Sequence, residues 1–325
     1  MWRRFRERAA APELMDEAFQ GGAELREAYR HLRRLNRLFG AARPVLYGVR
    51  RLWTEAGRPA ALSVLDIGAG SGDVNRLLLR WADRQGLRMT VVLADRSEEA
   101  CAEARRLFRG EPRVRVVRGD LFRLPPACAD IVTATQFAHH FAPDELPRVA
   151  QCLLRASRLG VVLCDIHRHW VPWLAVWLAT RLLSRNRFIR HDGPLSVAKG
   201  FVADDWRRLG EALADGELTC RWRPLFRHVA VIRRVAPDVA LDVAPHAPPD
   251  DALDVASRAA PDDTPAAARN VDWNTARRAA PAAVRNGGPH APEEEPLPGI
   301  RNLSLSNRMP GSLDRRSRPE EGDRP

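Results

Sequence analysis

Short apolar runs alternate with helical patterns through the first half of the chain. Five runs rich in β-branched residues read "LSVLDIG" (62–68), "MTVVLAD" (89–95), "VRVVRGD" (114–120), "ADIVTATQ" (129–136) and "GVVLCDI" (160–166). Helical spacing of apolar residues separates most of these runs, at 74–84, 97–109 and 144–157. Because strands that are buried on both faces read as continuous apolar runs, the pattern predicts an α/β fold with a parallel sheet between two layers of helices.

Two flanking segments extend this pattern. Residues 12–56 place apolar side chains at helical spacing between arginines, which predicts an N-terminal helical region. Near residue 224, two β-like runs, "ELTCRWRP" and "FRHVAVIRR", are separated only by a tight turn. A short turn cannot join parallel neighbours, so the last strand should run antiparallel. The full prediction is a Rossmann-like, seven-stranded, mostly parallel sheet with an antiparallel last strand and helices on both faces.

The composition changes abruptly after residue 236. Proline, alanine and aspartate dominate residues 237–325, and this segment carries 11 arginines and 15 acids. Such a stretch buries too little apolar surface to offset the entropy of ordering, so it is predicted to be a disordered tail. The predicted organisation is therefore an N-terminal helical cap at 1–58, a domain at 59–236 and the tail at 237–325.

Charge and cysteine content narrow the choice of partners. The formal net charge is +11, but 51 of the 52 basic residues are arginines and the exception is Lys199. Near-exclusive use of arginine indicates a codon bias, so the charge is weak evidence for nucleic acid, and no DNA partner is expected. The five cysteines form no CxxC pair and no metal-ligand spacing, which predicts reduced thiols, no metal and a cytoplasmic protein. The amino-terminal residues also lack the apolar core of a secretion signal.

A glycine-rich turn, "VLDIGAGSGDV" (64–74), follows the first predicted strand. Backbone N–H groups in such a turn can approach a ligand closely at the start of a helix. A phosphate-binding P-loop would need Lys-Ser or Lys-Thr after the last glycine, but Asp73 stands there. The spacing also differs from the G-x-G-x-x-G of dinucleotide-binding proteins. Asp66, two residues before the first glycine, suits a ligand with an ammonium group.

Two more acids end the strands that follow. Asp95 lies 23 residues after Gly72, where a carboxylate can accept hydrogen bonds from both hydroxyls of a ribose. Asp120 ends the third run, where its carboxylate can accept from an adenine amino group. Because the carboxyl ends of parallel strands meet at one edge of a sheet, these two acids and Asp66 should line one crevice.

These motifs resemble those of the class I S-adenosylmethionine-dependent methyltransferases. The matching segments are "VLDIGAGSGD", "LADRSEE", "GDLFRLP" and "ADIVTATQFAHHF", in the family's order, and the terminal hairpin matches the family's reversed seventh strand. The resemblance implies S-adenosylmethionine as the cofactor, with its methionine part near Asp66 and Gln136, its ribose at Asp95 and its adenine at Asp120. The implied cofactor-binding residues are Asp66, Gly68, Gly70, Gly72, Asp95, Arg96, Asp120, Leu121 and Gln136. An empty crevice and a nicotinamide-dependent oxidoreductase are the alternatives.

Two histidines, His139 and His140 in "FAHHFAPDE", follow the fourth strand at the mouth of the crevice. A histidine there could deprotonate a phenol or hydroxyl as the methyl group is transferred, because its pKa lies near working pH. The alternative is that both histidines pack or cap locally, since methyl transfer from a sulfonium can rely on alignment of the nucleophile with the methyl group.

An apolar segment with several tryptophans follows the fifth strand, at 167–200. Trp170, Trp173 and Trp177 fall at i, i+3 and i+7, on one helical face, and the apolar stretch is too short to span a membrane. The segment is either a helix packed on the core or a lid over the substrate crevice. Its arginine-rich flank would let the lid rest on a membrane surface.

The N-terminal helical cap is expected to close the crevice over the sulfonium and to exclude water. Arg33, Arg34 and Asn36 lie on or near this cap. Either one of them holds the cofactor's carboxylate, or they form an exposed polar face.

Shorter segments, "PELMD", "LRRLNRLFG" and "RHDGPLSV", resemble bacterial methyltransferases of type III polyketide and phenolic-lipid pathways. This resemblance implies a small apolar acceptor, through O-methylation of a phenol or C-methylation of a quinol on a polyketide or lipid-like ring. His191 and Asp192 either line the acceptor pocket or cap the turn before a helix at 203. The competing functions are a non-catalytic cofactor-binding protein and a nucleic-acid methyltransferase, although no amide-proline-aromatic motif follows the fourth strand. The sequence does not determine the oligomeric state.

Overall fold

The computed structural model describes residues 5–17 and 22–234, so the tail predicted at 237–325 lies outside the described residues. The strands are β1 (Ala61–Ile67), β2 (Arg88–Asp95), β3 (Val114–Arg118), β4 (Ala129–Thr135), β5 (Ser157–Ile166), β6 (Gly216–Arg223) and β7 (Arg227–Arg234). The helices are α1 (Leu14–Glu17), α2 (Ala23–Leu38), α3 (Ala42–Glu55), α4 (Asn75–Gln85), α5 (Glu98–Leu107), α6 (Leu146–Ala156), α7 (Trp170–Leu183), α8 (Arg187–Lys199) and α9 (Ala203–Glu211), with short 3-10 helices η2 (Leu121–Arg123) and η3 (Ala138–His140).

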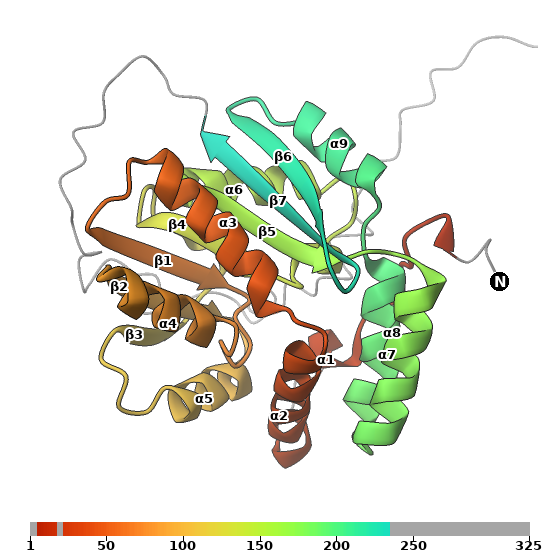
Figure 1. Ribbon diagram of the computed structural model, residues 1–325. Helices are drawn as coiled ribbons and strands as arrows, with labels where there is room; N and C mark the ends of the chain where they lie inside the picture. The colour runs from red at the N-terminus through yellow and green to blue at the C-terminus, as the bar shows by residue number, and fades with distance from the viewer. Residues whose placement is uncertain (1–4, 18–21, 235–325) are drawn as a thin grey trace, which may run out of the picture. The chain divides into compact units, whose positions relative to one another are not determined.

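The strands form one sheet in the order β3-β2-β1-β4-β5-β7-β6 (Figure 1). The strands β1 to β5 pair in parallel, whereas β7 runs antiparallel to both of its neighbours, β5 and β6. The short β6–β7 connection requires this reversal, because a tight turn can join only antiparallel strands. The predicted Rossmann-like fold is confirmed, and the predicted strands and helices agree with the observed ones to within a few residues.

Side chains alternate between two buried clusters along the central strands. In β1, Val64 packs in a cluster with α3 and α4, while Leu65 packs in a second cluster with α6 and α9. Both side chains are only 1% exposed. Because helices cover both faces of the sheet, the parallel strands carry apolar residues at successive positions, which explains the continuous apolar runs in the sequence.

The N-terminal helical region divides into two parts. Helix α3 lies on the sheet, where Gly48 is so close to Val162 of β5 that a Cβ atom at Gly48 would overlap it. Helix α2 instead packs against α5 and α8, with Leu25 and Tyr29 buried beside Phe188. Helix α3 therefore covers the sheet, and within the described residues α1 and α2 are the parts of this region that are placed to act as a cap.

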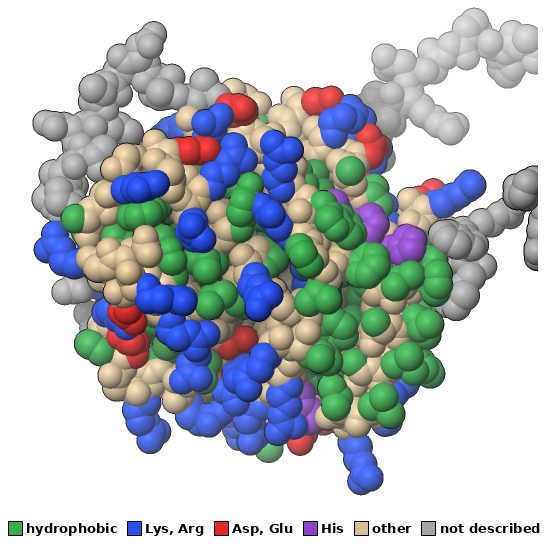
Figure 2. Space-filling model, in the orientation of Figure 1, with side chains coloured by type: hydrophobic (Ala, Val, Ile, Leu, Met, Phe, Trp, Pro, Cys, Tyr) green, Lys and Arg blue, Asp and Glu red, His purple; other side chains and the backbone are tan. Residues whose placement is uncertain are grey.

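The segment after β5 forms two helices, α7 and α8, that pack against each other. Gly193 allows the close contact, because a Cβ atom there would lie 2.8 Å from Thr180 Cγ2. Figure 2 shows hydrophobic side chains gathered on the surface over these helices. No helix within the described ranges is long and apolar enough to cross a membrane.

The suggestion that His191 and Asp192 cap a turn before residue 203 is wrong. Both residues lie inside α8, which continues through Pro194. Proline lacks the N–H that would donate to the Arg190 carbonyl one turn earlier. The Arg181 guanidinium donates to that carbonyl instead, at 3.1 Å, so the packing of α7 compensates for the proline.

Gly48→Ala is expected to lower the free energy of unfolding by about 1–3 kcal/mol, because the new methyl group has to displace the stiff, buried side chain of Val162. Urea unfolding followed by circular dichroism measures the change. Arg50→Ala, at an exposed position of the same helix, is the control and should change stability by less than about 0.5 kcal/mol. Equal stability of the Gly48→Ala and wild-type proteins would contradict the packing of α3 on β5.

Candidate functional site

The glycine turn connects β1 to α4 and depends on three left-handed residues. Gly68, Gly70 and Gly72 have φ angles of 61°, 57° and 70°, which side-chain-bearing residues rarely adopt. A Cβ atom would also overlap Phe137 at Gly68 and Leu93 at Gly72. The turn therefore has its shape because these positions are glycine, and its backbone is open to close approach at Gly70, where the nearest side chain, Tyr29, would lie 3.8 Å from a Cβ atom.

Asp66, at the end of β1, holds this turn in place. Its carboxylate is 1% exposed and accepts hydrogen bonds from Asn75 Nδ2 at 2.6 Å and from Thr133 Oγ1 at 2.7 Å. Burial raises the pKa of Asp66 to about 6, although both hydrogen bonds oppose the shift. The observed contacts link β1 to β4 and to the first turn of α4, and the contact with an ammonium group stays a prediction.

Asp95, at the end of β2, faces the same turn. Its Oδ2 atom accepts from the Gly70 N–H at 2.8 Å, and its Oδ1 atom accepts from the Ser97 N–H at 2.9 Å. Burial raises the pKa of Asp95, an effect that these backbone donors and the charge of the nearby His140 oppose. Asp95 thus lies directly beside the glycine turn, as the sequence predicted.

Asp120 and Leu121 begin the 3-10 helix η2 after β3. The Asp120 carboxylate accepts from the Phe122 N–H at 3.0 Å, and Arg96 Nε lies 4.0 Å from it. Leu121 is 4% exposed, and its side chain packs in the hydrophobic core beneath the segment that carries Asp120. Because β3, β2 and β1 are neighbours in the sheet, Asp120, Asp95 and Asp66 lie at or just beyond the carboxyl ends of adjacent strands. That the three acids line one ligand site stays a prediction.

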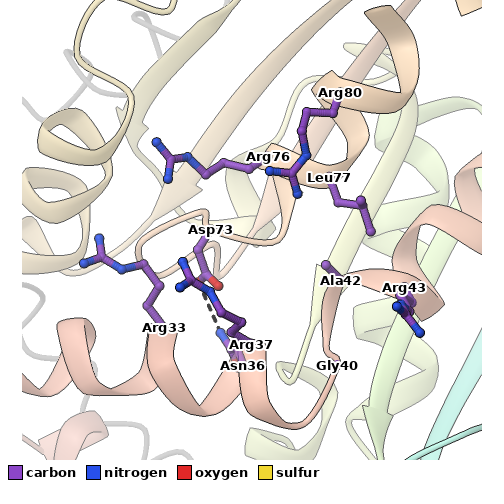
Figure 3. Close-up of a pocket in the computed structure, with 10 residues that line it drawn as sticks. All are labelled: Arg33, Asn36, Arg37, Gly40, Ala42, Arg43, Asp73, Arg76, Leu77 and Arg80. Carbon is purple, nitrogen blue, oxygen red and sulfur yellow. Dashed lines mark hydrogen bonds between the residues drawn. The ribbon is translucent and has the colours of Figure 1, made fainter. Parts of the chain in front are cut away.

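Helix α2 is joined by hydrogen bonds to the glycine turn and to the segment after β4. Asn36 donates to Asp73 Oδ1 at 3.2 Å (Figure 3). Gln136 Nε2 donates to Asn36 Oδ1 at 2.7 Å. Asn36 therefore joins the glycine turn to the segment after β4. Burial raises the pKa of Asp73, and hydrogen bonds from Asn36 and Ser71 together with the charge of Arg33 oppose that shift. The role of these cap residues toward a cofactor carboxylate stays a prediction.

His139 is a buried charge centre. Its ring is 2% exposed, with Nδ1 2.8 Å from Asp165 Oδ1 and Nε2 3.4 Å from Glu13 Oε1. Burial opposes ionisation, but the carboxylates of Asp165 and Glu13 raise the pKa of His139 to about 9. A histidine that is protonated at neutral pH does not accept a proton, which argues against His139 as the general base.

His140 has a different environment, although its ring stacks on His139 with centroids 4.4 Å apart. Its side chain is 26% exposed, and its Nδ1 atom lies 2.8 Å from Asp16 Oδ2. A carboxylate at Nδ1 fixes the ring orientation and leaves Nε2 as the proton acceptor. Of the two histidines, His140 is the one whose surroundings suit a general base.

Several site residues were missed from the sequence. Glu13 and Asp16 lie in the "PELMD" segment, more than 120 positions away from the histidines they contact, and the resemblance of that segment did not indicate these contacts. The sequence does offer a signal for Asp165, because this residue lies at the end of β5, as the three predicted acids lie at the ends of their strands. Glu13, His139 and His140 lie close enough to share a metal ion, but the Lys199 ammonium already lies 3.4 Å from Glu13 Oε1.

Comparison with known proteins identifies a family model that matches part of the chain. Residues 64–160, which contain the glycine turn, all three strand-end acids and both histidines, match a family model described as a methyltransferase domain. The chain therefore contains a methyltransferase domain over residues 64–160. A search of curated protein sequences gave no significant match to the chain.

Solved structures share the fold of this methyltransferase domain. Human N-acetylserotonin methyltransferase in complex with SAM is 13% identical over 70% of this chain and 60% of its own, with a TM-score of 0.50. The plantazolicin methyltransferase BpumL in complex with SAH is 13% identical over 68% of this chain and 94% of its own, also with a TM-score of 0.50. At such identities the likeness concerns the fold alone.

Two chains from carbon-methylating systems also match, over about half of their own length. The citrinin polyketide synthase CMeT domain is 20% identical over 55% of this chain and 47% of its own, with a TM-score of 0.42. The CurJ carbon methyltransferase is 12% identical over 54% of this chain and 49% of its own, with a TM-score of 0.41.

The three tryptophans predicted to face the acceptor lie on α7 of the methyltransferase but have separate neighbours. Trp173 packs edge-on to Phe5 with centroids 6.2 Å apart, and the Arg181 guanidinium lies 4.6 Å above the Trp177 ring. Trp170 lies beside His169, with centroids 5.8 Å apart. Their contact with an acceptor stays a prediction.

His191 and Asp192 connect α8 to the N-terminal segment. The buried Asp192 carboxylate accepts from the backbone N–H groups of Leu14 and Met15, at 2.8 and 2.9 Å, and so caps the start of α1. His191 Nδ1 lies 2.7 Å from Asp192 Oδ1, and its side chain is 48% exposed. The pair therefore helps to fix the segment that carries Glu13 and Asp16.

The free energy of unfolding is expected to fall as the pH rises from about 6.5 to about 9. The pKa of His139 is about 9 in the folded protein and about 6.5 in the unfolded chain, so its stabilising charge is fully present below about pH 6.5 and is lost as the pH passes about 9. The loss should not exceed about 3 kcal/mol, and urea titrations across this range measure it. His139→Gln should remove most of the decline, whereas His191→Gln, at a largely exposed ring, should keep it. A decline that is identical in all three proteins would show that another group causes it.

Proposed function

We propose that this protein transfers the methyl group of S-adenosylmethionine to a small apolar acceptor, a phenolic or quinol ring of a polyketide or lipid-like molecule. The observation that carries the proposal is that His140, which contacts Asp16, lies close enough to Asp95 to act electrostatically on this carboxylate, and that Asp95 accepts a hydrogen bond from the glycine turn. A ligand site and a base suited to a phenolic proton thus lie side by side at the carboxyl edge of the sheet, where ligands bind in open α/β folds.

The residues at the crevice fit the proposed cofactor. A carboxylate has about four acceptor positions, so Asp95 can still accept from ribose hydroxyls beyond the backbone N–H groups of Gly70 and Ser97. Gly70 leaves its backbone open, and the buried ring of Tyr29 supplies an apolar wall above it. Burial and the charge of Asp95 raise the pKa of Tyr29, which keeps its hydroxyl protonated.

The chain's own residues would orient the reactants and accept a proton. When bound, S-adenosylmethionine supplies an electrophilic methyl group on sulfur. His140 Nε2 would take the proton of the acceptor hydroxyl while that oxygen is aligned with the methyl group. Asp16 holds the His140 ring at Nδ1 and stabilises the imidazolium that forms.

The cap would restrict water at the same place. Asn36 bridges Asp73 and Gln136, so α2 is tied to both sides of the crevice by polar contacts of this chain. Exclusion of water strengthens the electrostatic interactions inside a site and prevents competing hydrolysis. Human N-acetylserotonin methyltransferase, which has the same fold, is named for a small acceptor rather than for a nucleic acid.

Asp95→Asn is expected to raise the Kd for S-adenosylmethionine at least about tenfold, because it removes the charge that strengthens hydrogen bonds from the ribose hydroxyls. Isothermal titration calorimetry measures the affinity. Glu98→Gln, in which an exposed carboxylate three residues away is neutralised, is the control and should bind normally. Normal affinity of a folded Asp95→Asn protein would contradict the crevice assignment.

His140→Gln is expected to lower kcat about 100-fold or more with a phenolic acceptor, and Asp16→Asn should lower it less, because the imidazole that accepts the proton is then still present but loses the carboxylate that orients it. The assay follows transfer of an isotope-labelled methyl group to a panel of phenols, quinols and polyketides. RNA and protein are tested as further acceptors. The cofactor Kd should not change in His140→Gln.

Near-normal kcat of His140→Gln at all pH values would exclude the base role while leaving methyl transfer intact. Label that enters RNA or protein in place of the small molecules would exclude the proposed acceptor class. Cofactor binding without methyl transfer to any tested acceptor would instead favour a non-catalytic binding protein.

A further inference from the structure

Large hydrophobic side chains are exposed in one region of the described chain. The exposed fractions are 36% for Leu174, 45% for Leu178, 81% for Leu182, 50% for Leu183, 55% for Leu38, 49% for Trp222 and 54% for Leu225. Four of the seven lie on α7, and the others lie at the end of α2 and around the β6–β7 turn. Such clustering is unusual, because exposed apolar residues of a water-facing surface are normally scattered singly.

Local contacts join these side chains into one surface. Leu174, Leu178 and Leu182 are spaced four residues apart and so lie along one face of α7. Phe39, next to Leu38, packs on the small cluster that α7 and α8 form. A Cβ atom at Gly40 would lie 3.0 Å from Leu225 Cδ1, so the corner between α2 and α3 meets the β6–β7 turn.

A groove rich in arginine lies beside this apolar surface and shares Gly40 with it. The groove has a volume of about 370 Å³ and lies between α4 and the corner of α2 and α3. Its charged lining residues are Arg33, Arg37, Arg43, Arg76, Arg80 and Asp73. Figure 3 shows Arg33 and Arg37 of α2 across from Arg76 and Arg80 of α4, with Asp73 between them.

The groove carries a net positive charge that its own residues do not neutralise. Five guanidinium groups face one carboxylate, and Asp73 Oδ1 already accepts hydrogen bonds from Asn36 and Ser71. In Figure 2, blue arginine side chains gather beside the green apolar side chains on the same side of the molecule. We call the seven exposed hydrophobic residues and the five groove arginines together the basic apolar face.

We propose that the basic apolar face docks on the surface of an anionic lipid bilayer. The leucines of α7 enter the boundary between headgroups and acyl chains, Trp222 lies at the interface, and the groove arginines contact lipid phosphates. A second copy of this chain is the less suitable occupant, because a two-fold symmetric contact would bring the same arginine-rich groove of each copy into the interface. The proposal rests on the surface alone and holds whatever the methyl acceptor is.

Co-sedimentation of the full chain with vesicles tests the proposal. One vesicle type contains phosphatidylglycerol and phosphatidylcholine, and the other contains phosphatidylcholine alone. We expect binding to the anionic vesicles that Arg76→Gln/Arg80→Gln weakens at least tenfold, since each arginine near an anionic surface contributes about fivefold. Leu178→Gln/Leu182→Gln should weaken binding by a similar factor, because it removes apolar area that would enter the bilayer.

A matched pair, Arg109→Gln/Arg155→Gln, removes the same charge from exposed positions outside the face, one after α5 and one on α6. This control should bind within about twofold of the wild type, because screening limits the reach of distant charges. Cofactor affinity, measured in parallel, should be unchanged in all three pairs and establishes that each protein is folded.

Three outcomes would overturn the proposal. Equal binding to neutral and anionic vesicles would show that the groove arginines do not contact lipid phosphates. An equal loss of binding in the control pair would show that the net charge of the protein, and not this face, determines binding. A dimer in light scattering that Leu178→Gln/Leu182→Gln abolishes, without vesicle binding in the wild type, would assign the face to a second copy of the chain.

Discussion

A carboxylate that is buried away from water needs hydrogen-bond donors or a positive charge beside it, and three buried carboxylates at the ends of strands impose this requirement on the fold. Asp66 is matched by Asn75 and Thr133, and Asp95 by the backbone of the glycine turn and of the first turn of α5. Asp165 is matched by His139 and by the Ile166 N–H. Each requirement ties the end of a strand to a neighbouring segment, so the sheet, the turn and the histidines take fixed positions relative to one another.

Asp165 also fixes the position of the N-terminal segment. Because Asp165 and Glu13 both bond to His139, residue 13 has to lie over the end of β5. Arg8 strengthens the attachment by donating to the carbonyls of Lys199, His139 and Phe141. This anchoring brings Asp16 within reach of His140, so a charge cluster without a direct chemical role positions the pair proposed to accept the proton.

The two proposals concern adjoining surfaces that share Asn36 and Asp73 and that the same helices connect. Helix α2 contributes Tyr29 and Asn36 to the crevice and Arg33 and Arg37 to the groove. Helices α7 and α8 pack on each other, with α7 carrying exposed leucines and α8 holding α1 through Asp192. The proposed lipid-like acceptor is compatible with the proposed docking on a bilayer, but each proposal is tested by its own measurement.

Local periodicity was sufficient to predict the strands, the reversed last strand, the glycine turn and the strand-end acids Asp66, Asp95 and Asp120. These features depend on residues close together in sequence, because side-chain alternation, turn length and backbone φ are local properties. Pairing across the chain was not available from the sequence: Glu13 with His139, Asp16 with His140, and Arg181 with the carbonyl that Pro194 leaves free. Only tertiary packing decided those contacts, and with them the continuity of α8, the high pKa of His139 and the choice of His140, because each depends on groups that folding brings together from distant positions.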